Sequence, residues 1–402
     1  MKSNRLTNIL LSISAVIIIF EIGFKFGENK NNLLQGINGK TNALKNSNFN
    51  LYWEAYDKLN QKYVDKSKIN TDKLYYGSIK GMIGSVDDPY TFFMTPDENK
   101  QSKSDLEGKF EGIGAQLGLK EGRIVVIAPL KKSPSEIAGV KAGDFIDKVD
   151  DQSTKNWTLA TAVSKIRGNK GTKVKLTLDR DGKQIEVIIV RDQIMVNSVD
   201  LTFIKNVAIL KLSQFGDTTD SEWDQSVDNI ENKWKSGQIK GMVLDLRGNP
   251  GGYLESAVYL ASEFLPKGKL VVKQESTSVE SVNYMVDRDG QLLDIPLTVL
   301  IDQGSASASE ILSGAIRDYK RGKLVGVKSF GKGSVQEAVD LSGGAGLHVT
   351  VAKWILPKGD WINGKGIEPD IKIENKIDTG NTITTETDNQ LQKAISVVLG
   401  EN

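Results

Sequence analysis

The chain has 402 residues, enough for two or three domains. Its 52 basic and 51 acidic residues give a net charge of +1, and this balance provides no electrostatic footprint for nucleic acid or a polyacidic partner. The sequence contains no cysteine and one histidine, which excludes disulfides, a cysteine nucleophile and a multi-histidine metal site.

Residues 1–28 predict a membrane anchor. Lys2 and Arg5 precede an apolar run at 9–20, and the stretch 6–24 reaches the ~20 residues that cross a bilayer. Small residues suited to signal-peptidase cleavage do not follow, because Glu21 and Lys25 stand there. The positive residues come first, so we expect a single-pass cell-membrane protein whose body is extracytoplasmic. A cleaved and secreted form is the alternative.

Residues 29–50 are polar and predict a linker, and residues 51–109 predict a helical region. Apolar residues at helical spacing indicate one helix from Leu51 and a second at about 71–83. A turn at 87–91, with the sequence Asp-Asp-Pro-Tyr-Thr, then leads to the apolar residues 92–94. We interpret the aromatic residues here as core or dimer contacts rather than a ligand site, so a homo-oligomer is compatible with the sequence.

Residues 110–195 predict a second domain with several short strands. An apolar strand at 124–127 precedes a helix at 159–166 and two strands at 174–178 and 185–190. The dipeptide Asp181-Gly182 joins the last two strands and is typical of a hairpin turn.

The order of these elements resembles a PDZ domain. The resemblance implies that a peptide adds a strand to an exposed sheet edge, and that loop amides hold its terminal carboxylate. The loop expected to do so is formed by Gly112, Ile113, Gly114 and Ala115. A Gly-x-Gly sequence alone can also be a bulge or a turn.

Residues 196–376 predict an α/β domain. A strand at 207–212 is followed by a helix at about 219–235 and by an apolar strand at 241–247. That strand stops at a turn with the sequence Gly-Asn-Pro-Gly-Gly at 248–252, whose amides are available as donors. An ion pair between Asp245 and Arg247 is expected to be structural.

Three serines lie where a strand meets a helix. The apolar strand at 297–301 precedes Gly-Ser-Ala-Ser-Ala-Ser-Glu at 304–310, and helical spacing begins at Ile311. The first amides of such a helix point at developing negative charge, so one of the serines is a candidate nucleophile. A Ser/Ala-rich helix cap is the alternative.

Lys332 is the candidate base. It stands between Gly331 and Gly333, which indicates a backbone packed too closely for side chains. A buried lysine loses its charge readily, and a neutral amine can deprotonate a serine hydroxyl. A Ser-His-Asp triad would need His348, which alternates with apolar neighbours on a predicted strand.

Together these motifs resemble the C-terminal processing peptidases, over about residues 51–373. In that family a lysine follows the nucleophilic serine by 25 positions and a glutamine follows the lysine by 4, a spacing met here by Ser307, Lys332 and Gln336. The resemblance implies that Ser307 is the nucleophile, Lys332 the base and Gln336 the residue that orients the base. It assigns the oxyanion amides to Ala308 and to either Gly251 or Gly252.

We therefore expect an α/β (α+β multidomain) protein with a membrane anchor, a helical region, a PDZ-like domain and a crotonase/Clp-protease-like peptidase core, followed by a tail at 377–402 with a C-terminal helix. The expected function is a serine endopeptidase that cleaves the C-terminal region of exported or membrane-associated proteins with free, unstructured tails. The PDZ-like domain is expected to recognise the tail, and gating of the activity by this domain is a further expectation. No metal, cofactor or nucleic acid is expected. A tail-binding PDZ scaffold with an inactive core is the alternative, and a crotonase-type acyl-CoA enzyme rests on fold analogy alone.

Overall fold

The computed structural model describes residues 48–120, 122–130, 132–277, 280–374 and 385–401. The chain divides into two compact units, Met1–Gly77 and Ser78–Asn402, each of which is described by itself. Within the described part, no helix has the length and apolar character that crossing a membrane requires. The predicted anchor at 1–28 lies outside the described residues.

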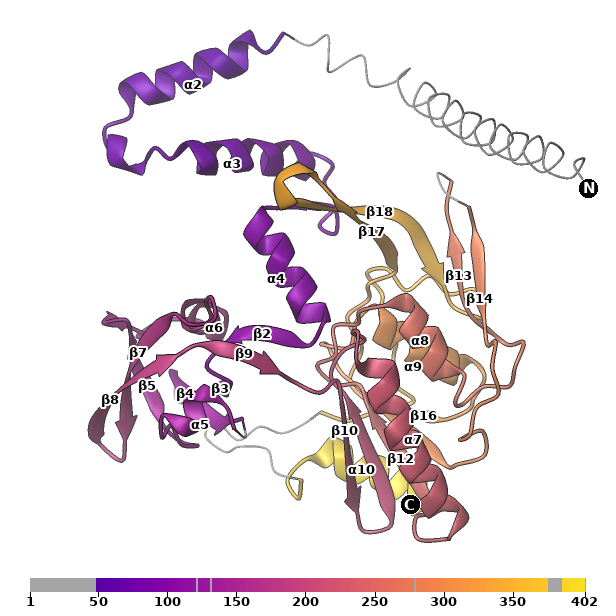
Figure 1. The fold of residues 1–402 in the computed structure, drawn as a ribbon. Coiled ribbons are helices and arrows are strands. Elements are labelled where there is room, and N and C mark those ends of the chain that lie inside the picture. Colours follow the sequence, from indigo (N-terminus) through magenta and orange to yellow (C-terminus); the bar gives the residue numbers. More distant parts are fainter. Residues whose placement is uncertain (1–47, 121, 131, 278–279, 375–384, 402) are drawn as a thin grey trace, which may run out of the picture. The chain divides into compact units, whose positions relative to one another are not determined.

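The first unit contributes α2 (Asn50–Lys62), a short 3₁₀ turn and most of α3 (Thr71–Gly84), in agreement with the predicted helices (Figure 1). No residue of α2 is buried. Tyr52 is 41% exposed and Trp53 is 57% exposed. The interpretation of these aromatics as core is therefore wrong for α2, because helical spacing predicts an apolar face but not the surface that covers it. Their role as dimer contacts stays a prediction.

The PDZ-like part of the second unit is a sheet in the order β3-β4-β5-β7-β8, with β6 beside β5. Its elements are β3 Ala115–Lys120, β4 Arg123–Pro129, α5 Pro134–Ile137, β5 Phe145–Val149, β6 Gln152–Ser153, α6 Leu159–Ile166, β7 Lys173–Arg180 and β8 Lys183–Val190. Asp181 and Gly182 both have positive φ, 53° and 79°, as a two-residue type I′ hairpin requires. The predicted hairpin turn is therefore confirmed.

The α/β core of this unit contains a six-stranded sheet in the order β10-β11-β12-β15-β16-β19. β10 and β11 are antiparallel, and each later strand is parallel to its neighbour. The strands are β10 Val199–Ile204, β11 Val207–Leu212, β12 Gly241–Asp245, β15 Leu297–Ile301, β16 Lys323–Gly326 and β19 Ile371–Lys372.

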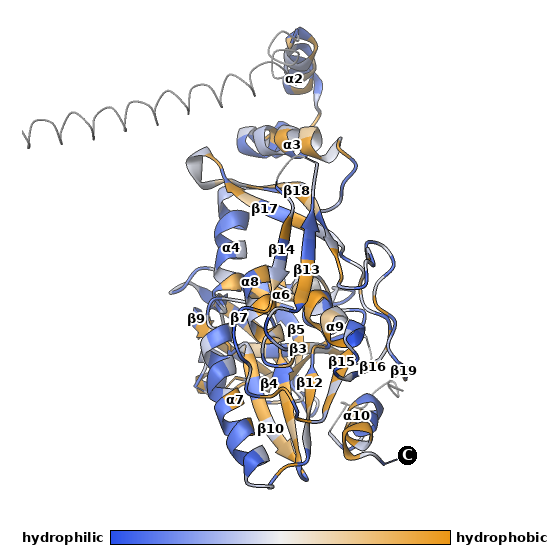
Figure 2. Ribbon diagram, turned by 90° about the vertical axis from the view of Figure 1, so that its right-hand side faces the viewer, coloured by the Kyte–Doolittle hydropathy of each residue, from blue (hydrophilic) through white to orange (hydrophobic). Residues whose placement is uncertain are grey.

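Helices cover both faces of this sheet, so its central strands carry apolar residues on both faces rather than on one. On β12, Met242 and Leu244 pack in one cluster with three helices, whereas Val243 packs in another with the last helix. Figure 2 shows β12 in the hydrophobic colour and α7 mostly in the hydrophilic one. The helices are α7 Thr219–Lys235, α8 Leu254–Ala261 and α9 Ala308–Asp318 on one face, and α10 Asn389–Leu399 on the other.

A second sheet of the core is built around β18 (Gly346–Ile355). β17 (Ser334–Asp340), β13 (Leu270–Glu275) and β1 (Phe92–Met94) pair with β18, and β14 (Val282–Met285) pairs with β13. Sequence analysis placed residues 92–94 in a helical region. That assignment missed β1. Three residues are too few to show the alternation of a strand, and their pairing with β18 spans more than 250 positions.

Two further elements connect the parts of this unit. α4 (Pro96–Leu106) begins with a capping box formed by Thr95 and Glu98. β2 (Lys109–Gly112) pairs antiparallel with β9 (Asp192–Met195), so the strands that enter and leave the PDZ-like part lie side by side.

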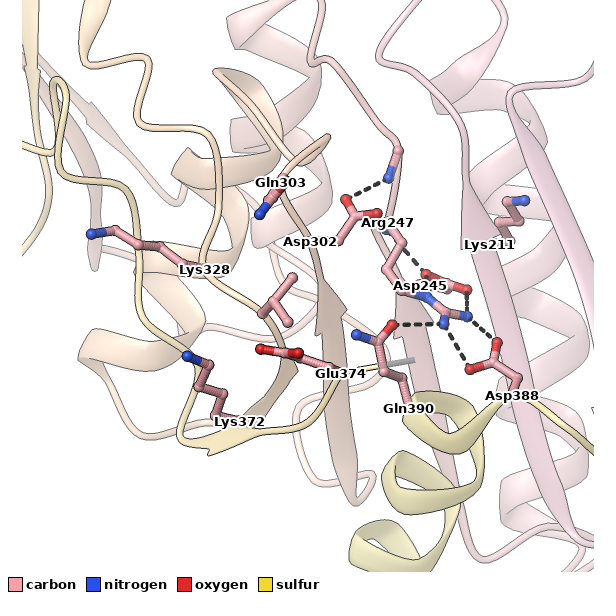
Figure 3. A pocket seen from close by; sticks show the side chains of 12 residues that line it. Lys211, Asp245, Arg247, Asp302, Gln303, Lys328, Lys372, Glu374, Asp388 and Gln390 are labelled. Carbon is pink, nitrogen blue, oxygen red and sulfur yellow. Dashed lines mark hydrogen bonds and ion pairs between the residues drawn. The ribbon is translucent and has the colours of Figure 1, made fainter. Parts of the chain in front are cut away.

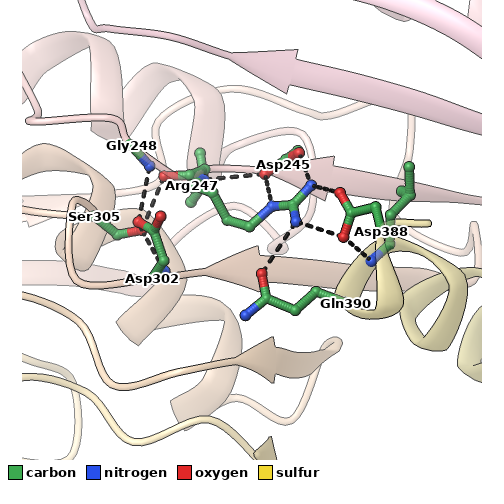
Figure 4. Close-up of polar contacts among 9 residues, drawn as sticks. Asp245, Arg247, Gly248, Asp302, Ser305, Asp388 and Gln390 are labelled. Carbon is green, nitrogen blue, oxygen red and sulfur yellow. Dashed lines mark hydrogen bonds and ion pairs between the residues drawn. The ribbon is translucent and has the colours of Figure 1, made fainter. Parts of the chain in front are cut away.

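Arg247 ties α10 to the sheet. It lies in a pocket of about 730 Å³ that is lined by charged side chains from the ends of several strands (Figure 3). Its guanidinium contacts Asp245 at 2.7 Å and Asp388 at 2.8 Å, and it donates to Gln390 at 3.1 Å (Figure 4). Asp388 also caps α10 by accepting a hydrogen bond from Leu391 N at 3.0 Å. The Asp245–Arg247 ion pair is thus structural, as expected, and it fixes the start of the C-terminal helix.

The variant Asp388→Ala should lower the free energy of unfolding by about 2–4 kcal/mol, because it removes a helix cap and one partner of a largely buried cation. Urea denaturation measures the loss. The control is Asp360→Ala, since Asp360 is 60% exposed where it pairs with Arg317 and should cost less than about 1 kcal/mol. Equal losses for the two variants would contradict the role given to Asp388.

Candidate active site

Ser307 lies at the start of α9, in the turn that follows β15. Its φ of 55° and ψ of −116° are unusual for a residue other than glycine, and they mark a strained strand-to-helix turn. Ser305 and Ser309 are fully buried, and their hydroxyls donate to Leu246 O and Asn249 O at 2.9 Å each. Ser307 is the partly exposed serine of the three. The structure therefore gives Ser305 and Ser309 structural roles and leaves Ser307 facing solvent.

The glycine turn after β12 packs directly against the Ser307 turn. Ala306 N donates to Asn249 O at 3.0 Å. A Cβ atom added to Gly251 would lie 2.8 Å from Ser307 Cβ and 3.0 Å from Ala308 N, so this close approach requires glycine. The buried side chain of Asn249 holds the turn by donating to Leu212 O at 2.9 Å. Sequence analysis missed Asn249, which was named only as part of a motif.

The two candidate glycines differ in the partners of their amides. Gly251 N donates to Asn249 Oδ1 at 2.9 Å. Gly252 N and Ala308 N make no hydrogen bond to any residue in the described ranges. Gly252 is fixed by its neighbours, since Phe215 N donates to Gly251 O at 2.9 Å and Tyr253 N donates to Phe215 O at 2.8 Å. The amides of Gly252 and Ala308 are thus the ones available to a ligand.

Lys332 is half-buried between two glycines whose backbones are closely packed, as predicted. Added Cβ atoms would lie 2.8 Å from Gly366 N at Gly331 and 2.5 Å from Asn363 N at Gly333. Burial lowers the pKa of Lys332 below its ordinary value, and the carboxylates of Asp88 and Glu310 oppose part of that shift. Among the described residues, the Lys332 amine has no hydrogen-bond acceptor and no carboxylate within 4.0 Å.

Glu310 joins the serine turn to the lysine loop. Its carboxylate is fully buried in α9 and accepts four hydrogen bonds. Oε2 accepts from Ser307 N at 3.0 Å and from Lys332 N at 2.9 Å, and Oε1 accepts from Gly331 N at 2.7 Å and from the Ser329 hydroxyl at 2.5 Å. One carboxylate therefore fixes the main chain of both candidate catalytic residues. Sequence analysis named Glu310 only as the last letter of a motif.

Gln336 lies on β17 and its amide nitrogen donates to Ser334 Oγ at 2.8 Å and to Thr350 Oγ1 at 3.2 Å. The expected role of Gln336 in orienting the lysine amine stays a prediction. His348 lies on β18, as expected from its alternation, and stacks on the Phe92 ring with centroids 4.8 Å apart. Burial and the charge of Lys332 lower the pKa of His348.

The loop expected to bind a peptide carboxylate connects β2 to β3. Gly112 ends β2, Ala115 begins β3, and the amides of Ile113 and Gly114 have no acceptor among the described residues. Gly114 has a φ of 70°, and an added Cβ would lie 2.5 Å from Ser133 Cβ. Because β3 is an edge strand of its sheet, a peptide strand can add beside it.

A cleft of about 680 Å³ opens beside the glycine turn. One wall is α4, with an acidic and polar face. The other wall is the segment that carries the candidate oxyanion amide. The lining residues are Asp97, Glu98, Gln101, Ser102, Asp105, Leu106, Gln214, Pro250, Gly251 and Gly252. The cleft therefore lies between the glycine turn and α4, which belongs to the region that the sequence predicted as a separate helical part.

Comparison with protein families assigns each main part of the chain. A model of peptidase family S41 matches residues 206–373, a PDZ-domain model matches 112–190, and a model of the activating protease CtpB N-terminal domain matches 19–98.

Relatives of this chain include the carboxy-terminal processing protease CtpA of Bacillus subtilis (strain 168), 38% identical over 83% of this chain and 71% of that protein. The carboxy-terminal processing protease CtpB of the same organism is 37% identical over 80% of this chain and 67% of that protein. A "Probable CtpA-like serine protease" of Staphylococcus haemolyticus (strain JCSC1435) is 40% identical over 79% of this chain and 63% of that protein.

Solved structures give the same result. A photosystem II D1 C-terminal processing protease is similar with a TM-score of 0.53 and 28% identity, covering 88% of this chain and 97% of that one. A putative S41 protease from Bacteroides fragilis NCTC 9343 has a TM-score of 0.58 at 16% identity, covering 86% of this chain and 96% of that one, and supports the fold alone.

The variant Glu310→Gln should lower kcat by ~10² or more and the free energy of unfolding by about 2–4 kcal/mol. Glutamine keeps the size of the side chain but lacks one acceptor oxygen, so one pair of buried donors loses its partner. Peptide turnover and urea denaturation measure the two effects. Glu337→Gln, on the exposed part of β17, is the matched control and should change neither. A Glu310→Gln enzyme with the kcat of the native chain would refute the positioning role.

Proposed function

This chain belongs to peptidase family S41, the C-terminal processing serine proteases, and from that premise we propose that Ser307 is its nucleophile and Lys332 its general base. The observation that carries the assignment is the carboxylate of Glu310. It binds the main chain of both residues through the same oxygen, at 3.0 Å and 2.9 Å. Family membership leaves the alternative of an inactive scaffold without support.

The chemistry follows from the protonation of Lys332. The neutral amine accepts the proton of the Ser307 hydroxyl as Oγ attacks the scissile carbonyl carbon. The resulting ammonium then donates that proton to the leaving amine nitrogen, the C–N bond breaks, and an acyl-enzyme ester remains. Water attacks the ester with the amine again as base, and Ser307 leaves with the returned proton. Gln336, by resemblance to the family, orients the amine.

The oxyanion of each tetrahedral intermediate needs two donors beside Ser307. Gly252 N and Ala308 N fill this role in our proposal, because both lack a partner among the described residues. The amide of Gly251 is already engaged by Asn249 Oδ1 at 2.9 Å, so Gly251 serves by permitting the close approach of the two turns. Losing one such donor costs ~10²–10³ in rate.

Substrate choice is assigned to the PDZ-like domain. The amides of Ile113 and Gly114 bind the terminal carboxylate of a substrate, and its tail adds to the edge of β3. The substrates are then proteins or peptides with free, unstructured C-termini, because a folded tail cannot pair with a strand edge. Cleavage takes place upstream of the bound end.

The N-terminal segment is assigned to the membrane. Lys2 and Arg5 before the apolar run at 9–20 support an anchor with the peptidase domain outside the cytoplasm. The test uses a reporter that is active only outside the cytoplasm, fused after Asn402. We expect the fusion to be active and to fractionate with membranes. Recovery of the full chain in the soluble cytoplasmic fraction would contradict it.

Ser307→Ala, Lys332→Ala and Lys332→Arg should each abolish β-casein digestion, by ~10³ or more, while the thermal midpoint changes little. Arginine fails because guanidinium does not release its proton near neutral pH. Because the two residues act as a unit, the double alanine variant should be no worse than either single one. Lys328→Arg, whose side chain is 50% exposed, is the control and should keep full activity. Turnover by Lys332→Arg would contradict the assignment of Lys332 as the general base.

Recognition of the carboxylate is tested with two peptides of one sequence, one ending in a free acid and one in an amide. The native enzyme should cleave the acid at least ~10-fold faster at sub-saturating concentration, because a charged carboxylate makes the stronger hydrogen bonds to amides. Gly114→Ala should reduce this preference, since its Cβ collides with Ser133. Gly139→Ala, at another positive φ with open space around it, should not. Equal cleavage of the two peptides by the native enzyme excludes carboxylate recognition.

A further inference from the structure

The turn at 87–91, with the sequence Asp-Asp-Pro-Tyr-Thr, lies near the candidate site. Its Tyr90 ring lies beside Lys332. The Tyr90 ring centroid is 5.4 Å from the Lys332 amine nitrogen, and the charge of Asp88 acts on that amine. The turn and the lysine are more than 240 positions apart, and they meet because β1, which follows the turn, pairs with β18.

The carboxylate of Asp88 is held in a fixed orientation. Oδ1 accepts from Tyr90 N at 3.1 Å, and Oδ2 accepts from the Thr91 hydroxyl at 2.7 Å. Thr91 Oγ1 in turn accepts from Thr350 N on β18 at 3.1 Å. Although burial opposes it, hydrogen bonds from Thr350 and Thr91 keep the pKa of Asp88 below its ordinary value. Asp88 is therefore an ionised group whose position is set by the same sheet that carries β17 and the lysine loop.

The reaction of Lys332 creates a charge that this half-buried position must accommodate. Accepting the Ser307 proton converts the amine into an ammonium, and burial disfavours that form. Glu310 is the other carboxylate that acts on Lys332, but its oxygens already accept four hydrogen bonds. Asp88 accepts its hydrogen bonds from uncharged groups, Tyr90 N and the side chains of Thr91 and Thr350, and its charge has the right sign. Its stabilisation grows as the ammonium forms, which is what a catalytic contribution requires.

We propose that two residues of the turn at 87–91 assist the base: Asp88 is the counter-ion of protonated Lys332, and the Tyr90 ring shields its amine from water. Both act through Lys332 and are positioning residues. This inference rests on the proposed function, because it requires Lys332 to be the base. It gives the turn and β1 a function in the reaction beyond their contribution to the fold.

The proposal predicts opposite shifts in the pH dependence of the rate. The groups that face Lys332 are Asp88 and Tyr90 from the turn, Glu310 from α9 and His348 from β18. Activity rises with pH as the lysine loses its proton, and this limb of kcat/KM reports its pKa in the free enzyme. Removing the Asp88 charge lowers that pKa, so the limb moves to lower pH. Removing the Tyr90 ring admits water, which favours the ammonium, so the limb moves to higher pH.

The experiment compares kcat/KM of full-length Asp88→Asn, Tyr90→Ala and the native chain from pH 5.5 to 10 with an unstructured peptide. Asp88→Asn should move the limb by about half a pH unit or more toward acid and lower the plateau. Tyr90→Ala should move it by a similar amount toward alkali. Tyr90→Phe keeps the ring and should match the native limb. Asp87→Asn is the control for Asp88, since Asp87 is its exposed neighbour in the same turn.

Thr91→Val separates a charge effect from a loosened turn. It removes the hydrogen bond to Asp88 but keeps the carboxylate, so it should lower the thermal midpoint and leave the limb within about 0.2 pH units of the native one. The inference would be overturned if the rising limbs of the pH profiles of Asp88→Asn and Tyr90→Ala coincided with the native limb while Lys332→Ala was inactive. The Ser-Lys assignment would then still hold. Turnover by Lys332→Ala would overturn the proposed function itself.

Discussion

The site depends on the buried carboxylate of Glu310. Its two oxygens accept four hydrogen bonds, and three of these donors are main-chain amides from the Ser307 turn and the lysine loop. A buried carboxylate is costly unless it is fully hydrogen-bonded, so each loop is held in the one arrangement that satisfies it. The strained backbone of Ser307 persists because the surrounding contacts over-determine it.

Around this carboxylate, each neighbouring element adds one constraint. The parallel strands β12 and β15 bring their carboxyl-end turns together, as in other open α/β sheets. Glycine at position 251 lets the two turns touch, and the buried Asn249 holds the first turn in place. Loops and turns carry the candidate catalytic residues, while the sheet and its covering helices hold them in register.

Much of this arrangement was predictable from local patterns. The hairpin at Asp181-Gly182, the apolar strands of the core sheet and the helix at 159–166 follow from period and turn chemistry, and the structure confirms them. The candidate pair Ser307 and Lys332 comes from the motif spacing of the family that the sequence resembles, and it stays a prediction. The close packing of the flanking glycines was inferred from their lack of side chains, and the structure confirms it. These features are local, so a short stretch of sequence contains the information.

The features that sequence analysis missed depend on contacts between distant segments. Glu310 reads as an ordinary helix-start residue until the lysine loop, more than 20 positions away, is seen to donate to it. β1 pairs with β18 across more than 250 positions, and Thr91 of the turn before it accepts a hydrogen bond from Thr350 of β18. The prediction that the aromatic residues of α2 are core residues was wrong for a different reason. An apolar face on a helix does not show whether the same chain covers that face.

The central claim is that Ser307 is activated by a neutral Lys332. The most direct measurement is covalent labelling of the full-length chain with a fluorophosphonate, with the modified residue located by mass spectrometry. The account predicts a single adduct on Ser307, formed faster as pH rises, and no adduct in Lys332→Ala. An adduct on another serine, or equal labelling of Ser307 in the presence and absence of the lysine, would contradict it.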